Sequence, residues 1–263
     1  MLLVKSSKSF LKKIVPWPIL YLYRKFRSLP EDFPAIARFL TRPTKIKTTI
    51  FQRLNLILKF YRISYSIECP HSEGEMIRVA SAILSLEPSK QSVIVEAGSY
   101  KGGSTSKLCL AAHLAGKKLY VFDSFEGIPE NQEQHRKNIF GGAARFNKGD
   151  YSGSLDEVKA AVSKFGDINS CEFIKGWFEN TMPGFKEPVG VAYIDVDLQS
   201  STKTCLKYLY PLVVPNGRIF SQDGHLPLVI ELLNDKTFWE NEIGVKKPSI
   251  EDVGKKKLLE IEK

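Results

Sequence analysis

The stretch SVIVEAGSYKGGSTSKLCLAAHLAGKKLYVFDSF, residues 92–125, decides the fold class. It begins with a short apolar run, 92–98, that is rich in β-branched residues and ends in glycine. Residues 103–116 have a helical pattern, and 118–125 form a second apolar run that ends in an acidic residue. A strand, a helix and a strand in such a short stretch predict a βαβ unit whose two strands are parallel.

The same alternation continues toward the C-terminus. We expect a helix at 155–166, strands at 171–178 and 189–197, a helix at 201–213 and a strand at 217–224, followed by a further helix at 226–243 and a last strand at 255–262. A helix that opens near Ser72 precedes the series. Five parallel strands with crossover helices predict an α/β fold with a mostly parallel, doubly wound, Rossmann-like sheet.

Length and charge suggest one catalytic domain behind an extension. The 263 residues suffice for one large α/β domain with an appendage. Residues 1–70 hold 14 Lys and Arg against 3 Asp and Glu, a net charge of +11, which leaves −2 for the rest. We therefore divide the chain into a basic helical extension, 1–70, and a domain, 71–263.

The extension contains stretches in which apolar residues recur at helical spacing between Arg and Lys, over 17–63. Such amphipathic helices could cap the core, join two copies of the chain or lie on an anionic membrane. The apolar run Ile14–Tyr23 follows several lysines, as in a signal peptide, but Pro16 and Pro18 interrupt it and no cleavage site follows. We expect a soluble, cytoplasmic protein with an uncleaved N-terminus.

The four cysteines, at positions 69, 109, 171 and 205, are scattered without a CxxC pair. A zinc module is not indicated, and three of them fall in predicted helices or strands. They are expected to be free, buried thiols in a reducing compartment.

The first strand–helix junction is a glycine-rich turn, from Gly98 to Ser104, that would let the backbone approach a ligand closely. It is neither a Walker A motif nor a regular GxGxxG. Asp123 lies where a carboxylate would hold a pair of ribose hydroxyls. An acid at this place favours a ligand with free hydroxyls over one with a 2′-phosphate.

Acidic residues also follow the fourth and fifth predicted strands: Asp195, Asp197 and Asp223. Carboxylates at neighbouring strand ends predict an oxygen-rich site for Mg²⁺ or another divalent cation, which would orient an acceptor hydroxyl. The alternatives are that Asp197 caps the helix near Ser201 or the turn before it, and that Asp223 is a turn residue before Gly224.

The long, glycine-containing stretch between Gly127 and Leu155 has no clear periodicity. It follows the second strand, so it should lie at the carboxyl edge of the sheet, where ligands bind. His135 in this stretch is either a lid residue over the acceptor or a solvated loop residue.

The run from Val95 to Leu233 resembles the macrocin O-methyltransferase family, whose members methylate sugar hydroxyls of macrolides. The likeness rests on VEAGSYKGGS (95–104), FDSFEGIPE (122–130), KGWFENTMPG (175–184) and YIDVDLQSSTKTCLKYLYPLVVPNG (193–217). It implies a class I methyltransferase fold that uses S-adenosylmethionine and magnesium. The residues that would bind the cofactor are Glu96, Gly98, Ser99, Ser104, Asp123, Ser124, Trp177 and Phe178, and Asp195, Gln222 and Asp223 would hold the metal.

Gln222 departs from the family pattern, which has two adjacent aspartates here. Because an amide supplies no charge, we expect weaker Mg²⁺ binding than in the family. His225 then becomes a second catalytic candidate beside Asp195, as a base or substitute ligand, although it could equally be a polar loop residue.

The sequence therefore predicts a methyltransferase that acts on a hydroxyl of a sugar or secondary metabolite. The alternative is a non-catalytic Rossmann-like protein docked to a membrane or partner through its N-terminal helices. A nicotinamide-dependent oxidoreductase is disfavoured by the irregular glycine turn, and nucleic-acid binding by the absence of net positive charge on the domain. Oligomeric state stays open.

Overall fold

The computed structural model describes residues 16–263 except residues 90 and 135. One sheet has the strand order β3-β2-β1-β4-β5-β6. Its strands are β1 (Val93–Ala97), β2 (Leu119–Asp123), β3 (Cys171–Lys175), β4 (Val189–Ile194), β5 (Val213–Ser221) and β6 (Leu259–Glu262). β1 to β5 are parallel, and β6 is antiparallel to β5. The predicted mostly parallel, doubly wound sheet is confirmed.

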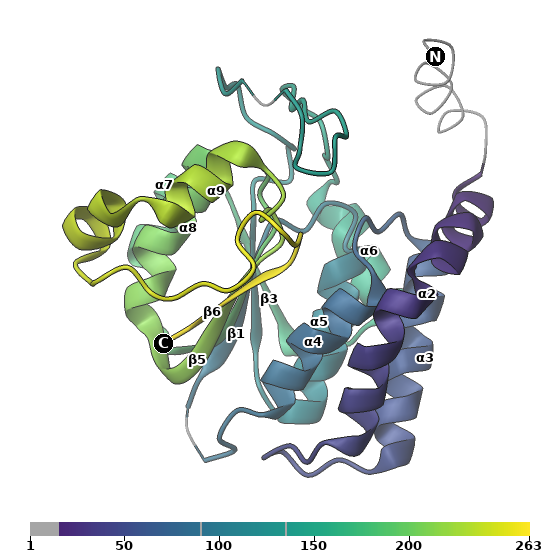
Figure 1. Cartoon of the computed structure of the whole chain (residues 1–263). Coiled ribbons are helices and arrows are strands. Elements are labelled where there is room, and N and C mark those ends of the chain that lie inside the picture. The colour runs from purple at the N-terminus through teal and green to yellow at the C-terminus, as the bar shows by residue number, and fades with distance from the viewer. Residues whose placement is uncertain (1–15, 90, 135) are drawn as a thin grey trace.

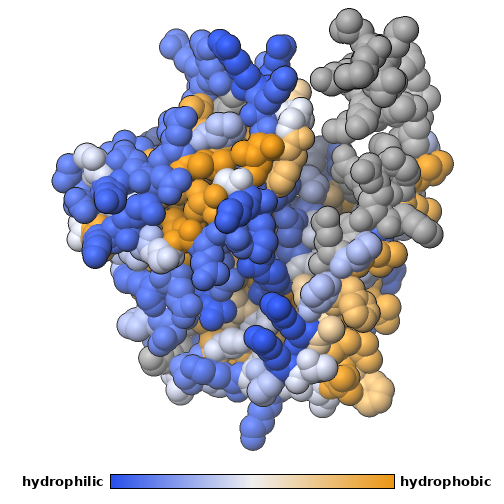
Figure 2. Space-filling model, viewed as in Figure 1, coloured by the Kyte–Doolittle hydropathy of each residue, from blue (hydrophilic) through white to orange (hydrophobic). Residues whose placement is uncertain are grey.

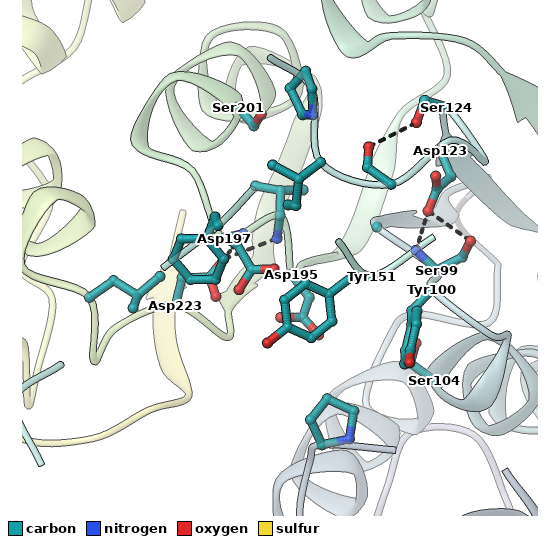
Figure 3. Close-up of a pocket in the computed structure, with 18 of the residues that line it drawn as sticks. Ser99, Tyr100, Ser104, Asp123, Ser124, Tyr151, Asp195, Asp197, Ser201 and Asp223 are labelled. Atoms are coloured by element: carbon teal, nitrogen blue, oxygen red, sulfur yellow. Dashed lines mark hydrogen bonds between the residues drawn. The ribbon is translucent and has the colours of Figure 1, made fainter. Parts of the chain in front are cut away.

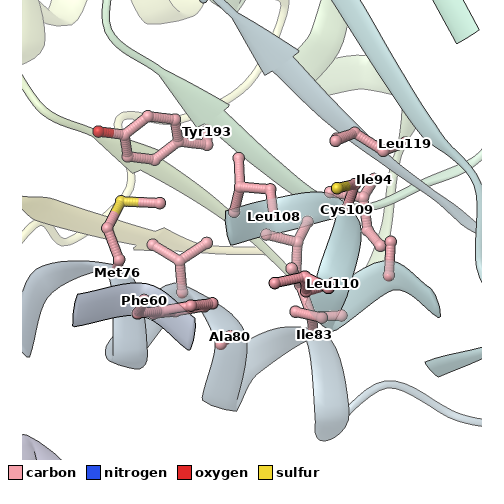
Figure 4. Packing of buried hydrophobic residues seen from close by; sticks show 14 of the residues in the cluster. Phe60, Met76, Ala80, Ile83, Ile94, Leu108, Cys109, Leu110, Leu119 and Tyr193 are labelled. Atoms are coloured by element: carbon pink, nitrogen blue, oxygen red, sulfur yellow. The ribbon is translucent and has the colours of Figure 1, made fainter. Parts of the chain in front are cut away.

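Helices cover both faces of the sheet. One face carries α4 (Glu73–Leu84), α5 (Gly103–Ala115) and α6 (Leu155–Phe165), and the other carries α7 (Phe178–Thr181), α8 (Gln199–Leu209) and α9 (Pro227–Asn234) (Figure 1). Because side chains alternate along a strand, β1 sends Ile94 to the first face and Val95 to the second. Figure 4 shows part of the first cluster, in which Met76, Leu108 and Tyr193 are buried.

The N-terminal region forms two helices, α2 (Trp17–Thr41) and α3 (Ile50–Ser66), which lie outside α4 and α5 (Figure 1). Pro18 lies in the first turn of α2, where the missing N–H breaks no hydrogen bond. Phe39 of α2 and Phe60 of α3 belong to the same buried cluster as residues of the sheet. The lysines at positions 5–13 lie outside the described residues, and the division at residue 70 stays a prediction.

The predicted helix over 226–243 is wrong in its length. α9 ends at Asn234, and a separate π-helical segment (Phe238–Ile243) follows. The break occurs at Asp235, whose backbone leaves the helical region and whose side chain accepts a hydrogen bond from the amide of Thr237 at 2.8 Å. The Trp239 indole then donates to the carbonyl of Leu233 at 3.0 Å, which folds the second segment back on α9.

Within the described residues, no helix has the length and apolar character required to span a membrane. The four cysteines are free thiols; Cys69, Cys109 and Cys205 are buried and Cys171 is half-buried. Three of them lie inside α5, β3 and α8, as predicted.

Candidate active site

A cavity of about 410 Å³ opens at the carboxyl edge of the sheet. It lies beside the ends of β1 and β4, where the strand order reverses and open α/β sheets bind ligands. Figure 3 shows two groups of polar residues in this cavity. Ser99, Asp123 and Ser124 form one group, and Asp195, Asp197 and Asp223 form the other.

The glycine turn brings the backbones of β1 and β4 together. Gly98 has a φ of +88°, and a Cβ at this position would lie 2.0 Å from the carbonyl oxygen of Asp195. The Asp195 amide also donates to the carbonyl of Ala97 at 2.9 Å. Only glycine permits both this conformation and this approach, so Gly98 fixes how close the two halves of the cavity lie.

Asp123 organises the half of the cavity that lies beside the glycine turn. Its Oδ2 accepts hydrogen bonds from the backbone amide and the hydroxyl of Ser99 at 2.6 and 2.8 Å. Its Oδ1 accepts from the amide of Phe125 at 2.7 Å. Asp123 thus ties the end of β2 to the glycine turn, and its carboxylate still borders the cavity.

Most of the other predicted cofactor residues line the same cavity, namely Ser104, Ser124, Trp177 and Phe178. Glu96 does not. It is fully buried, and its two carboxylate oxygens make no hydrogen bond of normal geometry with any described residue. Burial raises its pKa to about 8, although the nearby hydroxyls of Ser104 and Thr105 act in the opposite direction.

The acids of the second group are held by different contacts. Asp223 Oδ2 accepts from the backbone amides of Val196 and Asp197 at 3.0 and 2.9 Å, and thereby fixes the turn after β4. Asp197 has a positive φ of 61° within that turn. Asp195 follows β4 directly, and its Oδ2 lies 2.8 Å from Nε2 of His71.

The alternative that Asp197 caps the start of the following helix is wrong. α8 begins at Gln199, and Leu198 at its N-cap makes no side-chain hydrogen bond. Instead, the Glu133 carboxylate from the long loop accepts from the amides of Gln199 and Ser200 at 2.7 and 2.8 Å. Glu133 therefore supplies the hydrogen-bond acceptor for two of the amides that an α-helix leaves unpaired at its N-terminus.

The three acids differ in the direction in which their pKa values are shifted. Burial raises the pKa of Asp197 well above its usual value, and repulsion by Asp223 and Asp195 adds to this effect. Burial and the charge of Asp195 raise the pKa of Asp223 to about 7. Burial opposes ionisation of Asp195 too, but its hydrogen bond to His71 and the charge of that ring outweigh it and lower its pKa. Asp195 is therefore the most readily ionised of the three.

Only two of the three predicted metal ligands, Asp195 and Asp223, line the cavity. Gln222 is fully buried and is absent from the cavity wall; its Oε1 accepts from the hydroxyl of Tyr193 at 3.2 Å. Asp195 Oδ2 is bonded to His71, and Asp223 Oδ2 to two amides. Among the described residues, no three His, Cys, Asp or Glu side chains are placed to hold one metal ion. With Gln222 outside the cavity wall, these three residues do not form one three-ligand magnesium site, although Asp223 Oδ1 is buried without a hydrogen-bond partner in the described residues.

His225 lines the cavity, and its ring stacks on that of Phe140 at 6.4 Å. Burial, with the charge of Lys257, lowers its pKa to about 4, so the ring is neutral near pH 7. Its Nδ1 is buried without a hydrogen-bond partner in the described residues. The backbone carbonyl of His225 accepts from the amide of Ile139, which anchors the long loop.

The long loop is folded over the cavity. Its base is closed by hydrogen bonds between Ile128 and the Gly149–Asp150 pair at 2.9 Å. Its inner face contributes Asn138, Arg145 and Tyr151 to the cavity wall. His135 lies outside the described residues.

Sequence reasoning missed His71 and Cys69. Both line the cavity, and His71 lies between Cys69 Sγ, 3.2 Å from its Nδ1, and Asp195. Burial opposes its charged form, but Cys69 and Asp195 together raise the pKa of His71 to about 10. Only the pairing of distant segments shows this contact, because 124 positions separate His71 from Asp195.

A model of the macrocin-O-methyltransferase (TylF) family matches residues 88–249, more than half of the chain. The chain belongs to the macrocin-O-methyltransferase family. It is accordingly an S-adenosylmethionine-dependent O-methyltransferase. No curated protein matches its sequence.

Two solved structures of similar fold agree with this membership. The O-methyltransferase NovP aligns with a TM-score of 0.62 and 18% identity, over 81% of this chain and 99% of NovP. The calicheamicin methyltransferase CalS11 aligns with a TM-score of 0.54 and 13% identity, over 89% of this chain and 91% of CalS11. At these identities the likeness shows a shared fold.

Proposed function

We propose that this methyltransferase transfers the methyl group of S-adenosylmethionine to a hydroxyl of a sugar or a hydroxylated secondary metabolite. The observation that carries the proposal is that one continuous cavity contains both the glycine turn with Asp123 and the acids that follow β4 and β5. A donor bound against the first group would present its methyl group to an acceptor bound against the second. Holding both reactants in line supplies much of the catalysis.

The cofactor half has the groups that an adenosyl ligand requires. The Asp123 carboxylate would accept hydrogen bonds from the ribose hydroxyls, and Ser99 lies beside it. Trp177 and Phe178 supply an apolar border for the adenine. Glu96 lies beneath the turn and would act through Ser104 rather than by direct contact.

The acceptor half supplies a base. As the acceptor oxygen bonds to the methyl carbon, the carbon–sulfur bond breaks and its electron pair stays on sulfur, leaving S-adenosylhomocysteine. The hydroxyl proton passes to a carboxylate oxygen of Asp195, whose side chain keeps 18% of its surface exposed. Asn138, Arg145 and Ser201 are polar groups in the same wall that suit an acceptor rich in hydroxyls.

This mechanism has no metal step, because Gln222 lies outside the cavity that Asp195 and Asp223 line. Assistance by Mg²⁺ stays a prediction from the family resemblance. His225, the second predicted catalytic residue, is neutral and would contact the acceptor rather than hold a metal.

The test combines binding and turnover. Calorimetry with S-adenosylhomocysteine should show binding to the wild-type chain, and mass spectrometry should detect products heavier by one methyl group from a panel of glycosides. Turnover should persist in EDTA. Cofactor binding without methylation of any acceptor would instead favour the non-catalytic alternative, and loss of turnover in EDTA would restore the magnesium prediction.

We also propose that the outer face of α2 and α3 contacts an anionic membrane. Residues 33–66 contain seven Lys and Arg and no acidic residue. Arg53 is buried, and the other six are exposed. Figure 2 shows orange side chains gathered at the position of these helices. The exposed large apolar residues of α2 and α3 include Leu29, Phe33, Ile50, Phe51, Leu54 and Leu58. Apolar and basic groups together suit a surface of anionic lipid.

Vesicle sedimentation tests this contact. The full chain should bind phosphatidylserine-containing vesicles at low salt, and Phe51→Ser with Leu58→Ser should weaken that binding. Equal binding to neutral vesicles, or none at all, would refute it. A dimer in light scattering that the same double variant dissociates would assign the face to self-association instead.

A further inference from the structure

His71 is a buried imidazole whose two ring nitrogens are both engaged. It lies in the segment between α3 and α4, directly before the Ser72 cap of α4. Nε2 lies 2.8 Å from Asp195 Oδ2, and Nδ1 lies 3.2 Å from Cys69 Sγ. The ring also meets that of Tyr193 edge-on at 5.8 Å. Its orientation is therefore fixed from three sides.

This arrangement decides which group can take a proton. A ring with both nitrogens engaged offers no free nitrogen to an acceptor. Asp195 uses only Oδ2 for His71, and its other oxygen makes no bond with a described residue. The side chain of His71 is 4% exposed, against 18% for Asp195. Both side chains line the cavity, and Asp195 is the more exposed to it.

We propose that His71 is a positioning residue that holds the Asp195 carboxylate in the orientation required to receive the acceptor proton. The inference rests on the proposed function. In the step itself, the hydroxyl proton moves to the free oxygen of Asp195 while the methyl group moves from sulfur to oxygen. His71 keeps its own proton and donates Nε2–H to Oδ2 throughout.

The support behind His71 reaches the N-terminal helices. Lys107 of α5 donates to Ser64 of α3 at 2.6 Å and lies 3.5 Å from Cys69 Sγ. Lys107 also lies 3.9 Å from Glu73 at the start of α4. Lys107 of α5, held by contacts with α3 and α4, therefore supports Cys69, and Cys69 in turn contacts the His71 ring. Such outer contacts commonly orient a reacting group.

Three variants separate positioning from simple packing. His71→Ala removes the donor and should lower kcat about a hundredfold, with the acceptor KM and the affinity for S-adenosylhomocysteine changed less than threefold. His71→Gln places an amide N–H where Nε2 lies and should recover at least tenfold of that loss. His71→Asn reaches only the Nδ1 side and should resemble the alanine variant. Added imidazole should partly rescue His71→Ala and leave Asp195→Ala unchanged.

His113→Ala is the matched control. His113 also pairs with an aspartate, since its Nδ1 lies 2.7 Å from Asp167 Oδ2, but the pair lies on an exposed surface away from the cavity. This variant should keep wild-type kcat. Thermal melting of every variant checks that it is folded.

The outcomes distinguish the two proposals. A wild-type chain that methylates no acceptor refutes the proposed function, and the role of His71 with it. An active wild type with a folded His71→Ala variant of unchanged kcat refutes only the role of His71. So does a folded His71→Gln variant that is as impaired as His71→Ala.

Discussion

Among single residues, Glu96 shows most directly how burial sets charge. Its carboxyl group is enclosed beneath the glycine turn, and burial raises its pKa to about 8, whereas the unfolded chain has a value near 4.5. Between these two values the unfolded state has lost the proton and the folded state has kept it. Rising pH therefore favours unfolding over this range.

We expect Glu96→Gln to remove this dependence. From pH 4.5 to 8 the wild type should lose roughly 3–5 kcal/mol of unfolding free energy relative to the variant, since one pKa unit is worth about 1.4 kcal/mol. Urea unfolding of both proteins at pH 5 and pH 8 measures the difference. A gap between the two proteins that does not widen with pH would contradict a neutral Glu96.

Some residues of the candidate site could be identified from the sequence and others could not. Asp123 and Asp195 could be found because each ends a recognisable strand, and parallel topology brings strand ends to one edge. His71 could not be found, because it precedes the first strand and only packing of the N-terminal helices places it beside Asp195. Gln222 was misplaced because side chains alternate along a strand, and this one turns to Tyr193.

Among the elements, the glycine turn depends on a contact that few other residues could allow. Gly98→Ala would place a methyl group 2.0 Å from a carbonyl oxygen at a φ of +88°. We expect a loss of at least about 3 kcal/mol of stability and of cofactor binding, because both strain and overlap must be relieved. Gly116→Ala is the control. Its φ is +62°, but nothing lies within 4 Å of the added Cβ, so this substitution should lower stability by only about 1 kcal/mol. Chemical denaturation and calorimetry compare the two, and equal losses would contradict the role of the close approach.

The long loop is fixed by the cap that Glu133 places on α8. Glu133→Ala should cost about 1 kcal/mol of stability, as loss of a cap does, and should raise the acceptor KM several-fold because the loop wall loosens. S-adenosylhomocysteine affinity should change little. Glu130→Ala, an exposed position on the same loop, is the control. Steady-state kinetics decide, and an unchanged KM would show that the loop holds its place without the cap.

Elements themselves were predicted well where periodicity is strong. The βαβ unit and the later strands appear within a few residues of their predicted bounds. The helix over 226–243 failed because a local hydrogen bond at Asp235 interrupts an apolar pattern that continues past it. The loop over 127–155 has no such pattern, and its order comes from distant partners such as α8.

For the whole molecule, the N-terminal helices are joined to the catalytic body through buried charge. Lys25 of α2 forms ion pairs with Asp32 of the same helix and with Glu73 of α4, and all three are buried. The hydroxyl of Tyr21 donates to Glu73 at 3.3 Å. From Glu73, contacts continue through Lys107 and Cys69 to the residues of the cavity.

Lys25→Met tests this connection, because it keeps the apolar stem and removes the ammonium group. Two buried carboxylates would lose the Lys25 ammonium, and removal of one member of a buried ion pair costs about 3–5 kcal/mol. Glu73→Gln added to Lys25→Met should recover part of the stability, since one of the two buried negative charges that faced Lys25 disappears. Lys59→Ala, on the exposed face of α3, should change stability by no more than about 0.5 kcal/mol.

Unfolding curves of these variants, followed by tryptophan fluorescence and by circular dichroism, show whether the helices and the sheet unfold together. One shared, lowered transition for Lys25→Met is expected, because α2, α3 and the sheet contribute to one buried cluster. Its kcat should fall as well, since the support of His71 begins at Glu73. A Lys25→Met protein with the wild-type midpoint and kcat would mean that the N-terminal helices are only appended to the enzyme.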